Sequence, residues 1–291
     1  MDISVDICGV KWKNPITVAS GTFNYRESSA YYDVSSLGCI TTKGVAPVPW
    51  MGNPTPRIAE THGGMLNSIG LENRGVDDYL TNELIKLKEA GATVMANVAG
   101  HSIDEYVEVV KKLADSDVDL LELNISCPNI SSGGIAFGTD KELAAKLVAE
   151  VKKVSGKKPV VVKLSPNVTD ISAIALAVQA AGADALSMIN TLLGMRIDLK
   201  TGKPVLANGT GGLSGPAIHP VAVRMIYEVS RVVNIPIIGM GGVMTGEDAL
   251  ELMLAGATAV AVGTAALIDP TAPIRILDEL TALLEERQTS V

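Results

Sequence analysis

Cysteine and histidine are scarce in this chain, which has three of each among its 291 residues. The cysteines, Cys8, Cys39 and Cys127, lie far apart in the sequence. Their number and separation suit a reducing cytoplasm and exclude an all-cysteine iron–sulfur or zinc site within this chain. The histidines lack the spacing of metal ligands and are expected on loops or helix starts, so the sequence predicts no metal site.

Other sequence features are absent as well. No Gly-Lys-Ser/Thr phosphate loop occurs, and no Gly-x-Gly-x-x-Gly motif follows the first expected strand, which argues against ATP or a dinucleotide as ligand. No run of about 18 apolar residues is free of interruptions, and the first residues have no basic segment, so we expect neither a membrane span nor a signal peptide. The net charge of −8 argues against nucleic acid or an anionic membrane as a partner.

Short apolar runs alternate with amphipathic stretches along the whole chain. Continuous apolar runs are typical of parallel strands that are covered on both faces. The expected strands are Ile16–Ser20, Cys39–Lys43, Thr93–Val98, Leu120–Ile125, Val160–Leu164, Ala185–Asn190, Pro236–Met240 and Ala259–Gly263. The clearest expected helices are Asp77–Ala90, Asp104–Ala114, Lys141–Val154, Ile171–Ala181, Val221–Val232, Glu247–Ala255 and Ile274–Arg287.

This alternation, in a chain with 47% hydrophobic residues, predicts an α/β fold that forms one domain over residues 1–291. We expect an eightfold (β/α)8 TIM barrel, with an N-terminal hairpin and inserts over the C-terminal face of the barrel. A doubly wound sheet is the alternative, but the near-equal units and the chain length favour closure.

Polar residues and glycines follow the expected strands. Active sites of such barrels lie on the face where the strands' carboxyl ends meet, so we expect these residues to surround one mouth. Lys43 and Lys163 stand directly after apolar runs, where lysine seldom packs, and both are predicted to contact a ligand. In chain order the strand ends offer Ser20-Gly21, Lys43-Gly44, Asn97, Asn124, Lys163, Asn190-Thr191, Gly241-Gly242 and Gly263-Thr264.

The glycine turns after the last two strands indicate a phosphate site. Loops in these positions form the usual phosphate pocket of such barrels, because glycine lets backbone N–H groups approach the oxygens. Gly215, before the helix expected at Val221, could supply a third backbone contact. A mononucleotide-like cofactor is therefore better supported than ATP or a dinucleotide.

One loop combines amide and thiol chemistry. The segment Asn124–Asn129 follows an apolar run and places Cys127 between two asparagines. Asparagines can orient a polar heterocycle through neutral donors and acceptors, and a thiol can act as a base or nucleophile. A lone cysteine at a strand end is more often a packing residue. The flanking amides and the following glycines nevertheless favour a functional site here.

These segments, in this order, resemble the class 1 dihydroorotate dehydrogenases over essentially the whole chain. The motifs are Thr41–Gly44, Gly52–Arg57, Asn67–Leu71, Asn124–Asn129, Ile189–Thr191, Gly239–Gly242 and Val262–Thr264. Within class 1, Gly64–Asn67, Met195–Lys200 and Ala207–Pro216 look most like the class 1B catalytic subunit. Cys127 and the immediate start of the barrel disagree with class 2, which uses a serine base and carries an N-terminal membrane-associating extension.

The resemblance implies an FMN enzyme that oxidises dihydroorotate to orotate in pyrimidine synthesis. Cys127 would be the general base at C5 while hydride passes from C6 to flavin N5, and Lys163 would stabilise negative charge on the reduced ring. The implied substrate contacts are Lys43, Asn67, Ser68, Ile69, Gly70, Leu71, Asn124, Asn190 and Thr191. The implied flavin contacts are Ser20, Gly21, Lys43, Gly44, Asn97, Asn124, Lys163, Ile189 and Gly215, with Gly241, Gly242, Gly263 and Thr264 at the phosphate.

The resemblance also implies a second subunit. Class 1B enzymes pair this barrel with a subunit that carries FAD and an iron–sulfur cluster and passes electrons to NAD. We therefore expect a heterotetramer built on a homodimer of this chain. The alternatives are a class 1A homodimer that uses fumarate directly, a related barrel acting on another pyrimidine as in dihydropyrimidine dehydrogenase, and a non-catalytic flavin- or phosphate-binding barrel.

Replacement of Cys127 by serine tests the expected base. A hydroxyl gives up its proton far less readily than a thiol, whose ordinary pKa is about 8.5. Cys127→Ser is therefore expected to keep bound FMN and to lose most activity near neutral pH. The visible flavin spectrum measures FMN retention, and dihydroorotate-dependent turnover measures activity. Unchanged turnover would reject Cys127 as the base.

Overall fold

The computed structural model describes residues 1–126 and 137–289. Within these ranges the largest sheet has eight parallel strands in the order β3-β14-β13-β10-β9-β8-β7-β4. The eight expected strands are confirmed, each within two residues of its expected ends. They are β3 (Ile16–Val18), β4 (Ile40–Thr41), β7 (Val94–Val98), β8 (Leu120–Asn124), β9 (Val160–Lys163), β10 (Ala185–Met188), β13 (Ile237–Met240) and β14 (Ala259–Val262).

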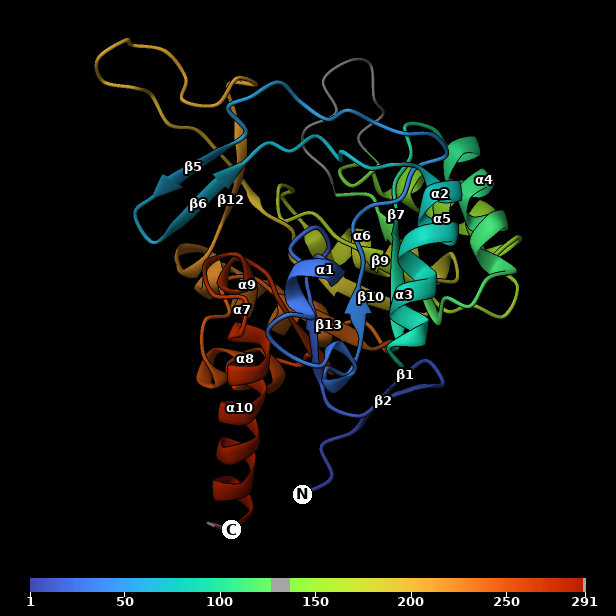
Figure 1. Cartoon of the computed structure of the whole chain (residues 1–291). Helices are drawn as coiled ribbons and strands as arrows, with labels where there is room; N and C mark the ends of the chain where they lie inside the picture. The colour runs from blue at the N-terminus through green and yellow to red at the C-terminus, as the bar shows by residue number, and fades with distance from the viewer. Residues whose placement is uncertain (127–136, 290–291) are drawn as a thin grey trace.

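The first and last strands of this order, β3 and β4, lie side by side and close the sheet. The backbone N–H of Gly38 donates to the carbonyl of Ile16 at 2.9 Å, and the hydroxyls of Thr17 and Thr41 are 3.1 Å apart. Figure 1 shows the helices wrapped around the strands. The predicted (β/α)8 barrel is therefore confirmed, and the alternative of an open doubly wound sheet is excluded.

The expected helices are confirmed with one difference. They are α4 (Ile103–Ala114), α5 (Lys141–Lys152), α6 (Ile171–Ala180), α7 (His219–Ser230), α8 (Gly246–Leu254) and α10 (Ala272–Thr289). In place of one helix over 77–90, the chain forms α2 (Val76–Asp78), a π-helical turn η2 (Tyr79–Glu83) and α3 (Leu84–Glu89). Tyr79 and Leu84 are both buried, and the i→i+5 bonding of a π-helical turn brings residues at this spacing closer to one face than an α-helix does.

Four short helical elements have no counterpart among the clearest expected helices. They are α1 (Tyr25–Ser28), α9 (Thr264–Ile268) and the 3-10 turns η1 (Val34–Ser36) and η3 (Pro216–Ile218). Three helices end at glycines that precede barrel strands: Gly91, Gly182 and Gly256 have φ values of 75°, 102° and 121°, a region that favours glycine.

The N-terminal hairpin closes the bottom of the barrel. It consists of the antiparallel strands β1 (Val5–Ile7) and β2 (Val10–Trp12). Ile7 and Trp12 are fully buried and pack with residues at the starts of the barrel strands, such as Met95 and Leu120. The same apolar cluster holds Cys39, with Cys8 packed against it, and burial raises the pKa of the Cys8 thiol to about 11.

As expected, inserts lie over the opposite end of the barrel, and there they form a sheet of their own. It contains β5 (Ile58–Thr61), β6 (Gly64–Asn67), β12 (Gly211–Ser214) and β11 (Leu192–Gly194), all antiparallel, in the order β11-β12-β6-β5. In Figure 1 this sheet stands above the barrel, and the N-terminal hairpin lies below it. Among the described helices, none is both long and apolar enough to span a membrane.

Candidate active site

A cavity of about 340 Å³ opens where the barrel strands end beneath the inserted sheet. This volume lies in the range of small-molecule sites. Most of the predicted site residues line it together, although their individual roles remain predictions. Those residues are Ser20, Gly21, Lys43, Gly44, Asn67, Ile69, Gly70, Leu71, Asn97, Asn124, Lys163, Ile189, Asn190, Thr191, Gly241, Gly242, Gly263 and Thr264.

Three predicted residues are not among the lining residues. Cys127 lies outside the described residues. Ser68 follows Asn67 at the end of β6, so its side chain faces the other way; it is buried, and Asn53 Nδ2 donates to its Oγ at 2.9 Å. Gly215 lies behind the cavity wall, where its carbonyl oxygen would be only 2.8 Å from a Cβ added at Gly242. Both residues support neighbours that do line the cavity.

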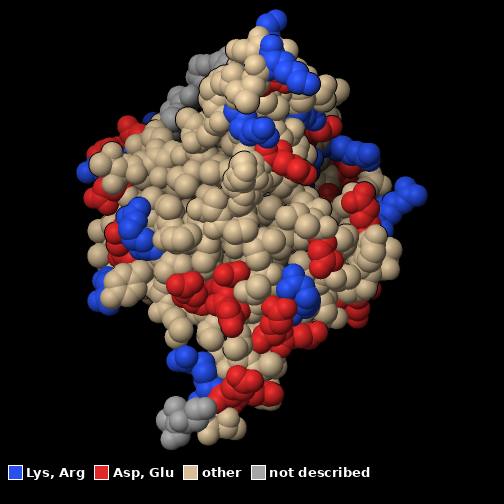
Figure 2. Space-filling model, turned by 90° about the vertical axis from the view of Figure 1, so that its left-hand side faces the viewer, with Lys and Arg blue, Asp and Glu red and all other residues tan. Residues whose placement is uncertain are grey.

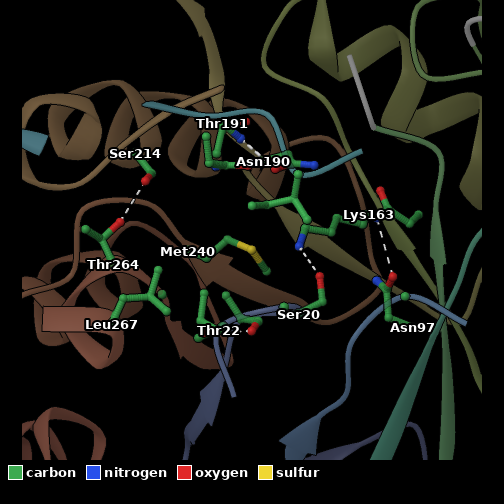
Figure 3. A pocket seen from close by; sticks show the side chains of 18 of the residues that line it. Ser20, Thr22, Asn97, Lys163, Asn190, Thr191, Ser214, Met240, Thr264 and Leu267 are labelled. Carbon is green, nitrogen blue, oxygen red and sulfur yellow. Dashed lines mark hydrogen bonds between the residues drawn. The ribbon is translucent and has the colours of Figure 1, made fainter. Parts of the chain in front are cut away.

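Lys163 is the most unusual charge in the cavity. It ends β9, is only 4% exposed, and its Nζ donates to Ser20 Oγ at 2.9 Å (Figure 3). No carboxylate in the described ranges forms an ion pair with it. A buried ammonium group without a counter-ion is costly, so this position favours a ligand that brings negative charge or electron-rich oxygens.

Lys43, at the mouth of the cavity, has an acidic neighbour that the sequence did not indicate. Glu83 ends the π-helical turn η2. Burial raises the pKa of the Glu83 carboxyl, the charge of Asp78 adds to this, and Lys43 acts in the opposite direction. The two cavity lysines therefore differ, because Lys43 feels a nearby carboxyl group and Lys163 is held by a hydroxyl.

A buried carboxyl group fixes the amide of Asn97. Asn97 Nδ2 donates to Glu122 Oε2, and Ser187 Oγ donates to Glu122 Oε1 at 2.6 Å. All three residues are fully buried. Because the carboxyl oxygen takes the amide N–H, Oδ1 of Asn97 points to the other side, where Asn124 Nδ2 donates to it at 3.4 Å. The only sequence signal for Glu122 is a charged residue inside an apolar run.

A second network fixes the amides of Asn124 and Asn190. Asn190 Nδ2 donates to Ser126 Oγ at 2.6 Å, and that hydroxyl donates to Asn124 Oδ1 at 3.0 Å. The backbone N–H of Thr191 donates to Asn190 Oδ1 at 2.7 Å. The cavity therefore offers uncharged donors and acceptors in set orientations, which suits a polar heterocycle.

The two glycine turns form the other side of the cavity. Gly241 and Gly242 have φ values of +130° and +70°, and a Cβ at Gly241 would lie 2.7 Å from the Cβ of Ala222. Only glycine fits there without strain, so the backbone of the turn is left bare. Across the cavity wall, Thr264 Oγ1 donates to Ser214 Oγ at 2.8 Å (Figure 3). These features suit the oxygens of a phosphate.

Several lining residues were not predicted. They are Ala19, Thr22, Ile58, Met65, Glu72, Ser214, Ile218, Met240, Ala261 and Leu267. Most are apolar or small and come from the inserted sheet or from the strand ends. Their side chains give the cavity apolar walls around the polar groups. Met65, Ser214 and Met240 lie within motifs of the resemblance, but no cavity contact was predicted for them.

The role of Glu122 is testable through stability. Glu122→Leu leaves the buried Asn97 N–H and Ser187 hydroxyl without their acceptor, so we expect it to lower the free energy of unfolding by about 2–5 kcal/mol. Glu122→Gln keeps an acceptor for Asn97 and is expected to cost about 1 kcal/mol or less. Urea denaturation measures both. Equal stability of the two variants would contradict the network.

Comparison of the chain with known proteins identifies its family. A family model described as dihydroorotate dehydrogenase matches residues 2–284. Three curated relatives carry the name dihydroorotate dehydrogenase B (NAD(+)), catalytic subunit. The protein of Alkaliphilus metalliredigens is 55% identical over 287 residues, which cover 98% of this chain and 95% of the relative. The proteins of Geobacillus kaustophilus and Bacillus cereus are each 57% identical over 286 residues, which cover 98% of this chain. The match covers 91% of the Geobacillus protein and 92% of the Bacillus protein. The chain therefore belongs to the dihydroorotate dehydrogenase family.

Proposed function

We propose that this chain is the catalytic subunit of an NAD-linked dihydroorotate dehydrogenase, which binds FMN and oxidises dihydroorotate to orotate in pyrimidine synthesis. The observation that carries the proposal is one cavity that combines buried Lys163, which has no carboxylate partner in the described part of the chain, and four asparagines, Asn67, Asn97, Asn124 and Asn190. In a chain of this family, that combination matches an electron-rich ring stacked near a polar pyrimidine.

The cavity fits FMN by its own features. Lys163 has no counter-charge among the described residues, Asn97 has a fixed amide, and the Gly241–Gly242 turn has room only for backbone. The residues proposed to hold FMN are Ser20, Gly21, Lys43, Gly44, Asn97, Asn124, Lys163 and Ile189, with Gly241, Gly242, Gly263 and Thr264 at the phosphate. Gly215 would act from behind, by packing against Gly242.

The remaining lining residues would bind and orient the substrate. Lys43 would pair with the substrate carboxylate, and Asn67, Asn124, Asn190 and Thr191 would hold the ring through their amides and hydroxyl. Ile69, Gly70 and Leu71 would cover it, and Ser68 would hold this segment in place through Asn53. Fixed amides favour one substrate orientation, which lowers the entropic part of the barrier.

Proton and charge handling would fall to two residues. Cys127 would take the proton from C5 of dihydroorotate; its role rests on the sequence resemblance, because it lies outside the described residues. Bound FMN would supply the acceptor for the hydride from C6. Lys163 Nζ, held by Ser20, would favour negative charge in the cavity, and such preorganised charge is usually a large catalytic contribution.

A partner subunit would carry the electrons away. The relatives' names include NAD(+) and catalytic subunit, which supports a separate electron-transfer subunit. We propose that this partner holds FAD and an iron–sulfur cluster and joins a homodimer of the chain in a heterotetramer, in the cytoplasm. Figure 2 shows a broad uncharged area on one side of the molecule, and exposed apolar residues such as Ile58, Leu193 and Ile268 support assembly.

The first experiment is an anaerobic spectrum of the purified chain before and after addition of dihydroorotate. We expect a visible flavin band that bleaches. Lys163→Gln is expected to slow this bleaching by about 10²–10³-fold, because it removes the buried charge. Lys153→Gln is the matched control, since Lys153 is exposed on the outside of the barrel and pairs with Glu150. A flavin that stays oxidised would contradict the proposed substrate.

Assembly is tested by gel filtration of the chain with and without the candidate electron-transfer subunit. Alone, we expect twice the chain mass of 30.3 kDa, and with the partner a larger species that contains both chains. NAD-dependent turnover is expected only from the larger species. Failure to co-elute, combined with fumarate-dependent turnover by the chain alone, would favour the class 1A homodimer instead.

A further inference from the structure

His219 lies directly behind the glycine turn that follows β13. It is the first residue of α7 and is only 8% exposed. A Cβ added at Gly242 would be 2.8 Å from the Cβ of His219 and 2.9 Å from its backbone nitrogen. His219 itself does not line the cavity in the described chain, so any influence on a ligand would pass through the turn.

The hydrogen bonds of the ring define its polarity. Nδ1 of His219 is 2.8 Å from the carbonyl oxygen of Gly241. A carbonyl oxygen only accepts, so Nδ1 carries a proton and donates. Nε2 faces two carboxylates of α8, at 3.2 Å from Glu251 Oε2 and 3.8 Å from Asp248 Oδ1. Nδ1 is therefore the ring nitrogen that faces Gly241, and Nε2 is the one that faces the carboxylates.

The net charge of the cluster formed by His219, Asp248 and Glu251 does not explain why a phosphate would bind here. Two carboxylates stand beside this one histidine, so the cluster as a whole does not attract a phosphate. The cluster contributes by setting the direction of the Gly241 carbonyl. The carbonyl oxygen of Gly241 is bound by a residue outside the cavity, so it is not presented to a ligand inside. A free carbonyl oxygen turned toward a phosphate would repel it.

The other groups around the ring are already committed. Asp248 accepts through Oδ2 from the backbone of Met244 and Thr245, at 2.8 and 2.9 Å, and so caps α8. Glu251 is more than half exposed, and in the described residues no other group donates to the Gly241 carbonyl. His219 is therefore the group that sets the direction of this carbonyl.

We propose that His219 is a positioning residue for phosphate recognition: its Nδ1–H holds the Gly241 carbonyl out of the cavity, so that the turn meets the phosphate of FMN with its N–H groups. This inference rests on the proposed binding of FMN and deepens it. It assigns to His219 the discrimination between a flavin with a phosphate and one without.

The test compares FMN with riboflavin, which has the same ring and no phosphate. The full-length chain, freed of flavin, is titrated with each ligand, and quenching of flavin fluorescence gives the dissociation constant. His219→Leu removes the donor at similar volume. We expect it to weaken FMN binding on the order of tenfold and to leave riboflavin binding unchanged.

His219→Asn is the matched rescue, because the Asn amide nitrogen superposes approximately on Nδ1. It keeps a donor for Gly241 and loses the contact with Glu251, so its preference for FMN over riboflavin should stay near that of the wild type. If His219→Leu does not fold, as judged by its thermal melt, His219→Gln replaces it, since the Gln amide superposes on Nε2 and reaches the carboxylates instead.

The outcomes separate the two proposals. Equal weakening of FMN and riboflavin, or no change at all, overturns the role of His219 and leaves the proposed function standing. The same holds if His219→Asn binds FMN as poorly as His219→Leu, because the donor is then not what matters. A wild-type chain that binds neither flavin overturns the proposed function and this inference with it.

Discussion

A closed parallel barrel gathers all its strand ends on one face, and the polar groups just below that face must then find partners inside the barrel. The hydroxyls of Thr17 and Thr41 meet this requirement at the seam between β3 and β4, at 3.1 Å. Ser20 stands three residues beyond Thr17, and Lys43 two residues beyond Thr41; both line the cavity. Because closure at the seam sets where both residues lie, the position of Ser20 beside Lys163 depends on it. The cavity is thus a consequence of how the barrel closes.

The bottom end of the barrel contributes mainly to stability, and the top end lines the cavity. At the bottom, Trp12 and Ile7 of the N-terminal hairpin fill the space between the strand starts and leave an apolar plug. At the top, the space between the strand ends is occupied by amides, a lysine and bare backbone, which have fewer apolar contacts to offer. Burying polar groups costs free energy unless each is paired, so the upper layer depends on the apolar plug and the surrounding helices for its stability.

The sequence predicted those parts of the molecule that local patterns encode. Continuous apolar runs marked the barrel strands, and a lysine directly after such a run marked Lys163, because both signals depend only on neighbouring residues. The pairing of β12 with β6 joins segments more than 140 residues apart, and its Gly-rich strand has no clear period-2 pattern. That sheet and the side chains it contributes, such as Met65 and Ser214, therefore could not be predicted. For Ser68, the motif was found, but the alternation of the strand turned its side chain away from the cavity.

Residues behind the lining were the least predictable, although they determine what the cavity presents. An asparagine amide can be turned by half a rotation at little cost, and a glycine peptide can present either its N–H or its carbonyl to a ligand. Glu122 can only accept from Asn97, and the ring of His219 donates to Gly241. Glu122 thereby selects one orientation of the Asn97 amide, and His219 selects one orientation of the Gly241 peptide. Each does so because it offers only one kind of hydrogen-bonding partner there. The chemical character of the cavity therefore depends also on two buried residues whose side chains lie outside it, so the lining residues alone do not determine what it binds.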